Sequence, residues 1–318
     1  MQAEQPYQVI AFYRFVPIQD PVAEVYRQKK YFKDRDIRGR IYISEEGINA
    51  QMSASNAEAE AYMAWMEADE RFAGIHYKLD PHPEHAFAKM IVKYREQLAA
   101  LDLKVDPAYG GEHVSPERWA EMLEDEQDYL LLDVRNDYEW DIGHFDGAIR
   151  PETETFRDFT EFTRKLQEGK DPKQTKVMMY CTGGIRCELF SAHMKKEGFD
   201  QVYQLDGGII NYGHKMGNKH WEGKLFVFDD RLAVPISEDE HSVIAHCHWC
   251  GTAADHPYNC ANMDCNNLFI SCKDCIEEHQ GCCCDGCTAA DRVRPLDHQL
   301  TGKPFRKWYH YRDQKAAS

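Results

Sequence analysis

The chain has 318 residues, 43% of them hydrophobic and 12% aromatic, and its formal net charge is −16. This length exceeds what one ordinary core supports, so we expect two or three domains, and the composition excludes a largely disordered chain. The negative charge argues against indiscriminate nucleic-acid binding but not against a local basic patch. No apolar run is long enough to span a bilayer and no signal peptide is evident, so we expect a cytoplasmic protein with no membrane partner.

Residues 1–100 alternate between strand-like and helix-like segments. Helical spacing follows a start signal at 20–35 and recurs at 56–72. Strand-like character, rich in β-branched and aromatic residues, is found at 7–16, twice within 38–55, at 74–81 and at 88–97. The order strand, helix, strand, strand, helix, strand predicts a ferredoxin-like domain with at least one extra strand, a fold that hosts many functions.

A linker-like segment at 101–112 carries Pro107 and a Gly110-Gly111 pair. Beyond it, short apolar strands at 128–134, 176–180 and 201–205 alternate with helical patterns, which predicts a parallel sheet covered by helices. We assign the linker and this α/β domain to 101–220, and a loop-rich, cysteine-rich domain to 221–318. The fold class is thus mixed α/β and α+β.

The stretch VMMYCTGGIRCELF, residues 177–190, places Cys181 at the carboxyl end of a buried strand and just before a helix. Ligands bind at this position in open α/β sheets. The loop amides can point inward and, with the helix N-terminus, favour a thiolate and an anion bound to it; they belong to Thr182, Gly183, Gly184 and Ile185. Arg186 adds a fixed positive charge. The alternative, a packing cysteine at a strand end, explains neither the glycines nor the arginine.

The segments LLDVRNDYEWDIGHFDGAI, CTGGIRC and LDGGI resemble a rhodanese domain over about residues 113–217. The resemblance implies a persulfide on Cys181. Asp133 and Arg135 match the family's D-V-R strand end, and His144 and Gly147 match its G-H-x-x-G-A turn. We expect structural roles for Asp133, Arg135 and His144 as strand-end caps and turn formers.

Phosphatases of related fold need a cysteine and an arginine in C-x5-R spacing to surround a phosphate. The spacing between Cys181 and Arg186 is C-x4-R, and Tyr180 stands where those enzymes carry histidine. We therefore set the phosphatase interpretation aside. Cys187, in the first turn of the next helix, either resolves an oxidised Cys181 or is a small buried residue, and we favour the second.

Ten of the twelve cysteines lie within residues 247–287. In a chain without an export signal, their C-x-x-C pairs indicate metal before disulfides. Two zinc ions in a cross-braced scheme would use eight of the ten sulfurs. The first ion would take Cys247, Cys250, Cys272 and Cys275, and the second would take Cys260, Cys265, Cys287 and either Cys283, which we prefer, or Cys284. An iron–sulfur cluster is an alternative that we rank below zinc, and reduced or disulfide-linked cysteines are a further one.

Two stretches are basic. Residues 26–42 hold seven Lys or Arg, and residues 292–315 hold another seven, interleaved with Phe305, Trp308, Tyr309 and Tyr311. Basic residues meet phosphates and aromatic rings stack on unpaired bases. A solvated helix face remains our preference for the first stretch, while RNA contact and a docked tail stay open for the second.

Three features in this order, SEEGINAQ, MYCTGGIRCE and the cysteine-rich segment, make nearly the whole chain similar to the bacterial tRNA uridine(34) hydroxylase family. The resemblance implies oxygen-dependent 5-hydroxylation of the wobble uridine to 5-hydroxyuridine. It also implies that Cys181 is the active-site residue, that molecular oxygen is a co-substrate and that the partner is the tRNA anticodon arm. We find no flavin or NAD signature and no facial pair of histidines with a carboxylate.

Two other functions stay open at this point. The first is a sulfurtransferase that works through a Cys181 persulfide, and the second is a zinc-dependent RNA-binding protein without catalysis. No obligate protein partner is indicated.

Overall fold

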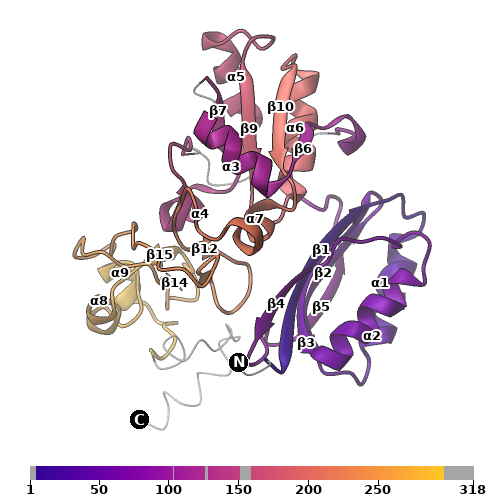
Figure 1. Ribbon diagram of the computed structural model, residues 1–318. Coiled ribbons are helices and arrows are strands. Elements are labelled where there is room, and N and C mark those ends of the chain that lie inside the picture. The colour runs from indigo at the N-terminus through magenta and orange to yellow at the C-terminus, as the bar shows by residue number, and fades with distance from the viewer. Residues whose placement is uncertain (1–4, 103, 126–127, 151–158, 297–318) are drawn as a thin grey trace. The chain divides into compact units, whose positions relative to one another are not determined.

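The computed structural model describes residues 5–102, 104–125, 128–150 and 159–296 (Figure 1). The chain divides into two compact units. The first comprises Met1–Asn136 and Ala148–Met216, and the second comprises Asp137–Gly147 and Gly217–Ser318. No helix in the described ranges combines the length and the apolar character that crossing a membrane requires.

The N-terminal part of the first unit is a five-stranded sheet with two helices packed on it (Figure 1). The strands are β1 (Tyr7–Phe15), β2 (Ile37–Ser44), β3 (Gly47–Ser55), β4 (Lys78–His82) and β5 (Met90–Tyr94), in the order β4-β1-β3-β2-β5. Strand β1 is antiparallel to β3 and β4, and β5 is parallel to β2. The helices are α1 (Pro21–Phe32) and α2 (Asn56–Glu67). The predicted ferredoxin-like order with an extra strand is confirmed.

Local capping and a buried charge network fix these helices. The Asp20 side chain accepts a hydrogen bond of 2.8 Å from the Ala23 amide, which begins α1 as a capping residue should. On α1, the buried Glu24 carboxylate accepts from the guanidinium groups of Arg27 and Arg71. Ile10, on the buried side of β1, is fully enclosed in the core.

The second part of this unit is a four-stranded parallel sheet, again as predicted. Its strands are β6 (Glu112–Val114), β7 (Leu130–Asp133), β9 (Lys176–Tyr180) and β10 (Gln201–Leu205), in the order β6-β10-β9-β7. The associated helices are η1 (Pro107–Tyr109), α3 (Pro116–Asp125), α5 (Phe159–Gly169), α6 (Ile185–Lys196) and α7 (Gly208–Met216). Val177 to Tyr180 of β9 are fully buried, as expected for a strand covered on both faces.

The second unit has short elements and long loops. It contains α4 (Asp137–Ile142), β8 (Gly143–Phe145), β11 (Trp221–Gly223), β12 (Leu225–Phe226), β13 (Ala233–Val234), β14 (Pro257–Asn259), β15 (Leu268–Ile270), α8 (Lys273–Glu278) and α9 (Asp285–Thr288). Strand β8 pairs antiparallel with β11, which joins residues 137–147 to the cysteine-rich part of the chain. Apart from its cysteines, the core of that part has few large side chains, among them Tyr258, Phe269 and Ile276.

A fully buried ion pair closes the end of β7. The Arg135 guanidinium donates to both carboxylate oxygens of Asp133, through Nε at 2.8 Å to Oδ1 and Nη2 at 2.5 Å to Oδ2. Both side chains have no exposed surface. The Arg135 guanidinium also lies 5.7 Å from the centre of the Tyr180 ring on β9.

Removing one member of this pair should be strongly destabilising, because a buried charge then loses its bidentate partner. We expect Asp133→Ala to lower the free energy of unfolding by roughly 3–5 kcal/mol, measured by urea denaturation. The matched control is Glu161→Ala, which removes an exposed partner of Arg164 on α5 and should leave the urea midpoint almost unchanged. Equal midpoint shifts for the two variants would contradict this assignment.

Candidate active site

Cys181 lies where β9 ends and the turn into α6 begins. Its side chain is buried, with 1% of the residue exposed. The amide of Gly184 donates a hydrogen bond of 3.1 Å to the Cys181 sulfur. Gly184 has φ +102°, a left-handed conformation that glycine adopts without strain, and it is the residue that precedes the first turn of α6. The turn therefore directs the helix N-terminus at the sulfur.

The surroundings of Cys181 stabilise its thiolate. Burial alone would raise the pKa of Cys181, but the Cys187 thiol, the Arg186 charge and the amides of Cys187 and Gly184 lower it to about 5. Burial and the neighbouring Cys181 raise the pKa of Cys187 well above its ordinary value. Cys187 consequently stays protonated and donates to the thiolate of Cys181. This pairing gives the second cysteine of the loop a role in stabilising the first.

The rest of the loop lies around the sulfur. Arg186 donates from Nη2 to the Thr182 hydroxyl at 3.2 Å, which fixes the guanidinium beside the loop. Gly184 is one of the four residues whose amides were expected to face the sulfur. The Cys187 amide also contributes, and sequence reasoning missed it. Its place in the first turn of a helix, where amides have no partner within the helix, is the signal that would have found it.

Residues of the N-terminal sheet lie against this loop. The Tyr13 hydroxyl on β1 donates to Glu188 Oε1 at 2.8 Å. The same hydroxyl lies so close to Gly184 that a Cβ there would meet it at 2.8 Å. Burial, then the Glu188 charge, raises the pKa of Tyr13, so its hydroxyl stays protonated as a donor. Sequence reasoning missed Tyr13 because nothing local links a residue on β1 to a helix 175 positions away.

Glu188 is the centre of a polar network at the start of α6. Besides Tyr13, its carboxylate lies 3.3 Å from His113 Nε2 and accepts from Gln204 Nε2 at 3.3 Å. The hydrogen bond to Glu188 raises the pKa of His113. Burial would raise the pKa of Glu188, but His113, Tyr13 and Gln204 lower it. The network holds an ionised carboxylate close to the Cys181 loop.

A cavity of about 720 Å³ opens next to this network. Its lining comes from both sheets of the unit and includes Tyr13, Lys78, His113, Glu188, Asp206 and Gly207. A volume of this size accommodates a nucleoside-sized group.

His144 and the basic stretch 26–42, which the sequence also singled out, have partners of their own in the structure. His144 shares a hydrogen bond of 2.9 Å between its Nδ1 and the Trp140 carbonyl, and it stacks on the Trp140 ring at 3.6 Å. In the basic stretch 26–42, Arg27 and Arg35 are ion-paired with acidic side chains. The aromatic residues of the basic tail lie outside the described residues.

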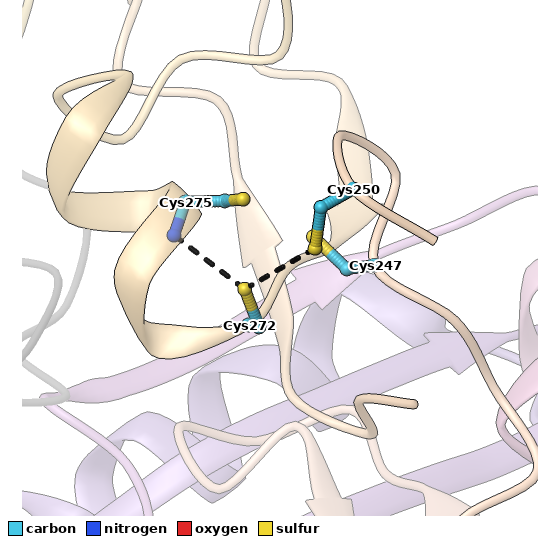
Figure 2. A group of neighbouring side chains, drawn as sticks. All are labelled: Cys247, Cys250, Cys272 and Cys275. Atoms are coloured by element: carbon cyan, nitrogen blue, oxygen red, sulfur yellow. Dashed lines mark hydrogen bonds between the residues drawn. The ribbon is translucent and has the colours of Figure 1, made fainter. Parts of the chain in front are cut away.

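Eight cysteines of the second unit gather in two groups. The first group is Cys247, Cys250, Cys272 and Cys275, and the second is Cys260, Cys265, Cys283 and Cys287. Within each group the sulfurs all lie within 4.8 Å of one another. Figure 2 shows the first group converging from a turn and from the start of α8. The pairs interleave along the chain, so the groups are cross-braced, and Cys282 and Cys284 belong to neither.

The sulfur separations suit a tetrahedral ion. Cys250 and Cys272 are 3.7 Å apart, Cys265 and Cys283 are 3.7 Å apart, and Cys283 and Cys287 are 3.9 Å apart. Four thiolates about 2.3 Å from a tetrahedral zinc ion lie about 3.8 Å from one another. None of these cysteines is in a disulfide. Each group can therefore hold a metal ion.

The charge state of Cys181 can be tested by its reaction with iodoacetamide. We expect the alkylation rate to rise through about pH 5 and to be level above pH 6, because the pKa of Cys181 is about 5 and only the thiolate reacts. Trypsin releases residues 177–186 as one peptide that contains Cys181 without Cys187. Mass spectrometry of this peptide measures the reaction at the single sulfur. A midpoint near that of an ordinary thiol would contradict the assignment.

Three stretches match known families. Residues 7–98 match the UPF0176 acylphosphatase like domain, residues 115–215 the Rhodanese-like domain and residues 222–288 the Rhodanase C-terminal family. The sequence also aligns over nearly its full length with curated proteins of several bacteria.

Three such relatives carry the same name, tRNA uridine(34) hydroxylase. The protein of Protochlamydia amoebophila is 54% identical over 98% of this chain and 97% of its own length. A Chlamydia trachomatis protein is 51% identical over 96% of this chain and 93% of its own. The Chlamydia pneumoniae protein is 49% identical over 96% of this chain and 94% of its own. The chain belongs to the tRNA uridine(34) hydroxylase family.

Proposed function

We propose that this protein hydroxylates the wobble uridine, U34, of tRNA at C5 and gives 5-hydroxyuridine, with Cys181 as its nucleophile. The observation that carries the proposal is a sequence identity of 49–54%, over nearly the full length of the chain, to proteins named tRNA uridine(34) hydroxylase. The surroundings of Cys181 support it, because they keep a reactive thiolate at neutral pH. Arg186 is its electrostatic partner, and the amides of the loop stabilise negative charge on the sulfur.

The chemistry expected of Cys181 follows from the reactivity of uracil. A thiolate that adds to C6 of the ring places negative charge on O4 and makes C5 nucleophilic, and C5 is the carbon that gains oxygen. Loss of the C5 proton and of the thiolate then restores the ring. The overall reaction converts uridine, dioxygen, two electrons and two protons into 5-hydroxyuridine and water. Molecular oxygen and a two-electron reductant are therefore the co-substrates of this reaction.

The tRNA test uses cells that lack the gene and carry the wild-type protein, Cys181→Ser or Cys284→Ser. We expect nucleoside mass spectrometry to find a uridine one oxygen atom heavier with the wild type and with Cys284→Ser, and none with Cys181→Ser. Cys284 is the matched control, since it is exposed and outside both metal-binding groups. Unchanged uridine in every strain would overturn the proposed substrate.

A sulfurtransferase is the second candidate, favoured by the rhodanese-like match and by the thiolate at Cys181. A persulfide on Cys181 would be held by the same amides and by Arg186. Thiocyanate formation from thiosulfate and cyanide measures this activity. Rapid transfer together with unmodified tRNA would favour it. Full tRNA modification with Cys181→Ser would instead favour a binding protein without catalysis.

We propose zinc as the metal of both cysteine groups. The thiolates of an iron–sulfur cluster bind to different irons and lie farther apart than the 4.8 Å limit met by all four sulfurs here. Four sulfurs around one ion suit structural zinc, which draws a loop-rich segment into a folded state. The metal would therefore fold the second unit and take no part in the reaction at Cys181.

Metal content distinguishes ligands from bystander cysteines. We expect plasma mass spectrometry to find two zinc ions per wild-type chain, one for each group, and about one per chain in Cys250→Ser. Cys284→Ser should keep both. Zinc removal by a chelator should unfold the second unit while Cys181 keeps its low alkylation midpoint, because its stabilising groups all lie in the first unit. Equal zinc loss in the two variants would contradict the ligand assignment.

A further inference from the structure

Lys78 is a buried lysine at the start of β4. Only 7% of the residue is exposed. It lines the cavity that Tyr13 and Glu188 also line. Among the described residues, its ammonium group has no hydrogen-bond or ion-pair partner. Its Nζ lies 5.2 Å from the centre of the Tyr13 ring. Burying an ammonium group without a counterion is costly, so its position calls for an anion.

The anionic groups that act on Lys78 are Cys181, Asp206 and Glu188. Burial lowers the pKa of Lys78, and these three groups oppose that change. Two of the three already have partners. Glu188 is bound by Tyr13, His113 and Gln204, and Asp206 lies 3.5 Å from His113 with 57% of its side chain exposed to water. The Cys181 sulfur is the most deeply buried of the three, so water can stabilise its charge least.

We propose that Lys78 is a positioning residue of the Cys181 site: from the N-terminal sheet, its ammonium group holds negative charge on the Cys181 sulfur. Arg186 supplies positive charge from α6, and Lys78 supplies it from β4. The N-terminal sheet thereby completes the site, which the α/β domain alone would present with one cation. The inference concerns the state of the sulfur and does not depend on the proposed substrate.

The position of Tyr13 supports this role. Tyr13 connects β1 to α6 through its hydrogen bond to Glu188, and its hydroxyl rests on Gly184, whose amide donates to the sulfur. Lys78 is on β4, which pairs with β1 in register. Tyr13 thus lies close to Gly184 through its hydroxyl and to the Lys78 ammonium group through its ring.

The test compares the pH dependence of Cys181 alkylation in the wild type, Lys78→Met, Lys78→Arg and Lys93→Met. Methionine is unbranched, one atom shorter than lysine and uncharged, and it suits a buried position. Lys93 is the matched control, an exposed lysine on strand β5 of the same sheet. The other groups that act on Cys181 or on Lys78 are unchanged in all four proteins; they are Arg186, Cys187, Tyr13, Glu188 and Asp206.

We expect the alkylation midpoint of Lys78→Met to move up by about one pH unit, equivalent to a roughly tenfold loss of thiolate stabilisation. Lys78→Arg and Lys93→Met should keep the wild-type midpoint. Thermal unfolding of each protein shows that the comparison is made between folded chains. A purely structural lysine would change the unfolding temperature and leave the midpoint where it is.

A wild-type midpoint in folded Lys78→Met would overturn the inference. If the KM for tRNA is also higher in that variant, Lys78 would be assigned to a phosphate of the substrate instead. Because alkylation needs no tRNA, a failure of the hydroxylase proposal would leave this result standing, and the two failures are distinguishable.

Discussion

The negative charge on the Cys181 sulfur is the constraint on which the site depends. The sulfur is buried at the end of β9, where water cannot solvate a thiolate, so the protein itself must supply the stabilisation. A glycine in a left-handed conformation, the first turn of α6 and the guanidinium of Arg186 provide it. The glycines and the arginine that mark the sequence are the parts of one electrostatic arrangement.

This arrangement extends beyond the α/β domain. Tyr13 and Lys78 belong to the ferredoxin-like sheet, yet one contacts the loop at Gly184 and the other lines the adjoining cavity. A ferredoxin-like fold hosts many functions, and here it supplies a hydrogen bond to Glu188 and a buried lysine to the cavity next to Glu188.

The sequence predicts much of this and leaves identifiable parts out. Strand and helix order, the parallel sheet and the Cys181 turn follow from local patterns, because periodicity and glycine positions are properties of short segments. Tyr13, Lys78 and His113 carry no local signal, since their roles arise only when distant strands meet α6. The pairing of residues 143–145 with 221–223 was likewise unexpected, because it joins a loop of the α/β domain to the cysteine-rich part.

The two kinds of cysteine in this chain are separated by their environments. Cys181 has one thiol donor, helix amides and a cation around it, which favour a reactive anion without occupying it. The eight grouped cysteines have three other sulfurs each within 4.8 Å, an arrangement whose charge repulsion a divalent ion relieves. The same functional group is therefore held as a single thiolate in the first unit and grouped in fours, able to hold a metal ion, in the second. The arrangement of groups around each sulfur distinguishes the two cases, because the thiol itself is chemically the same in both.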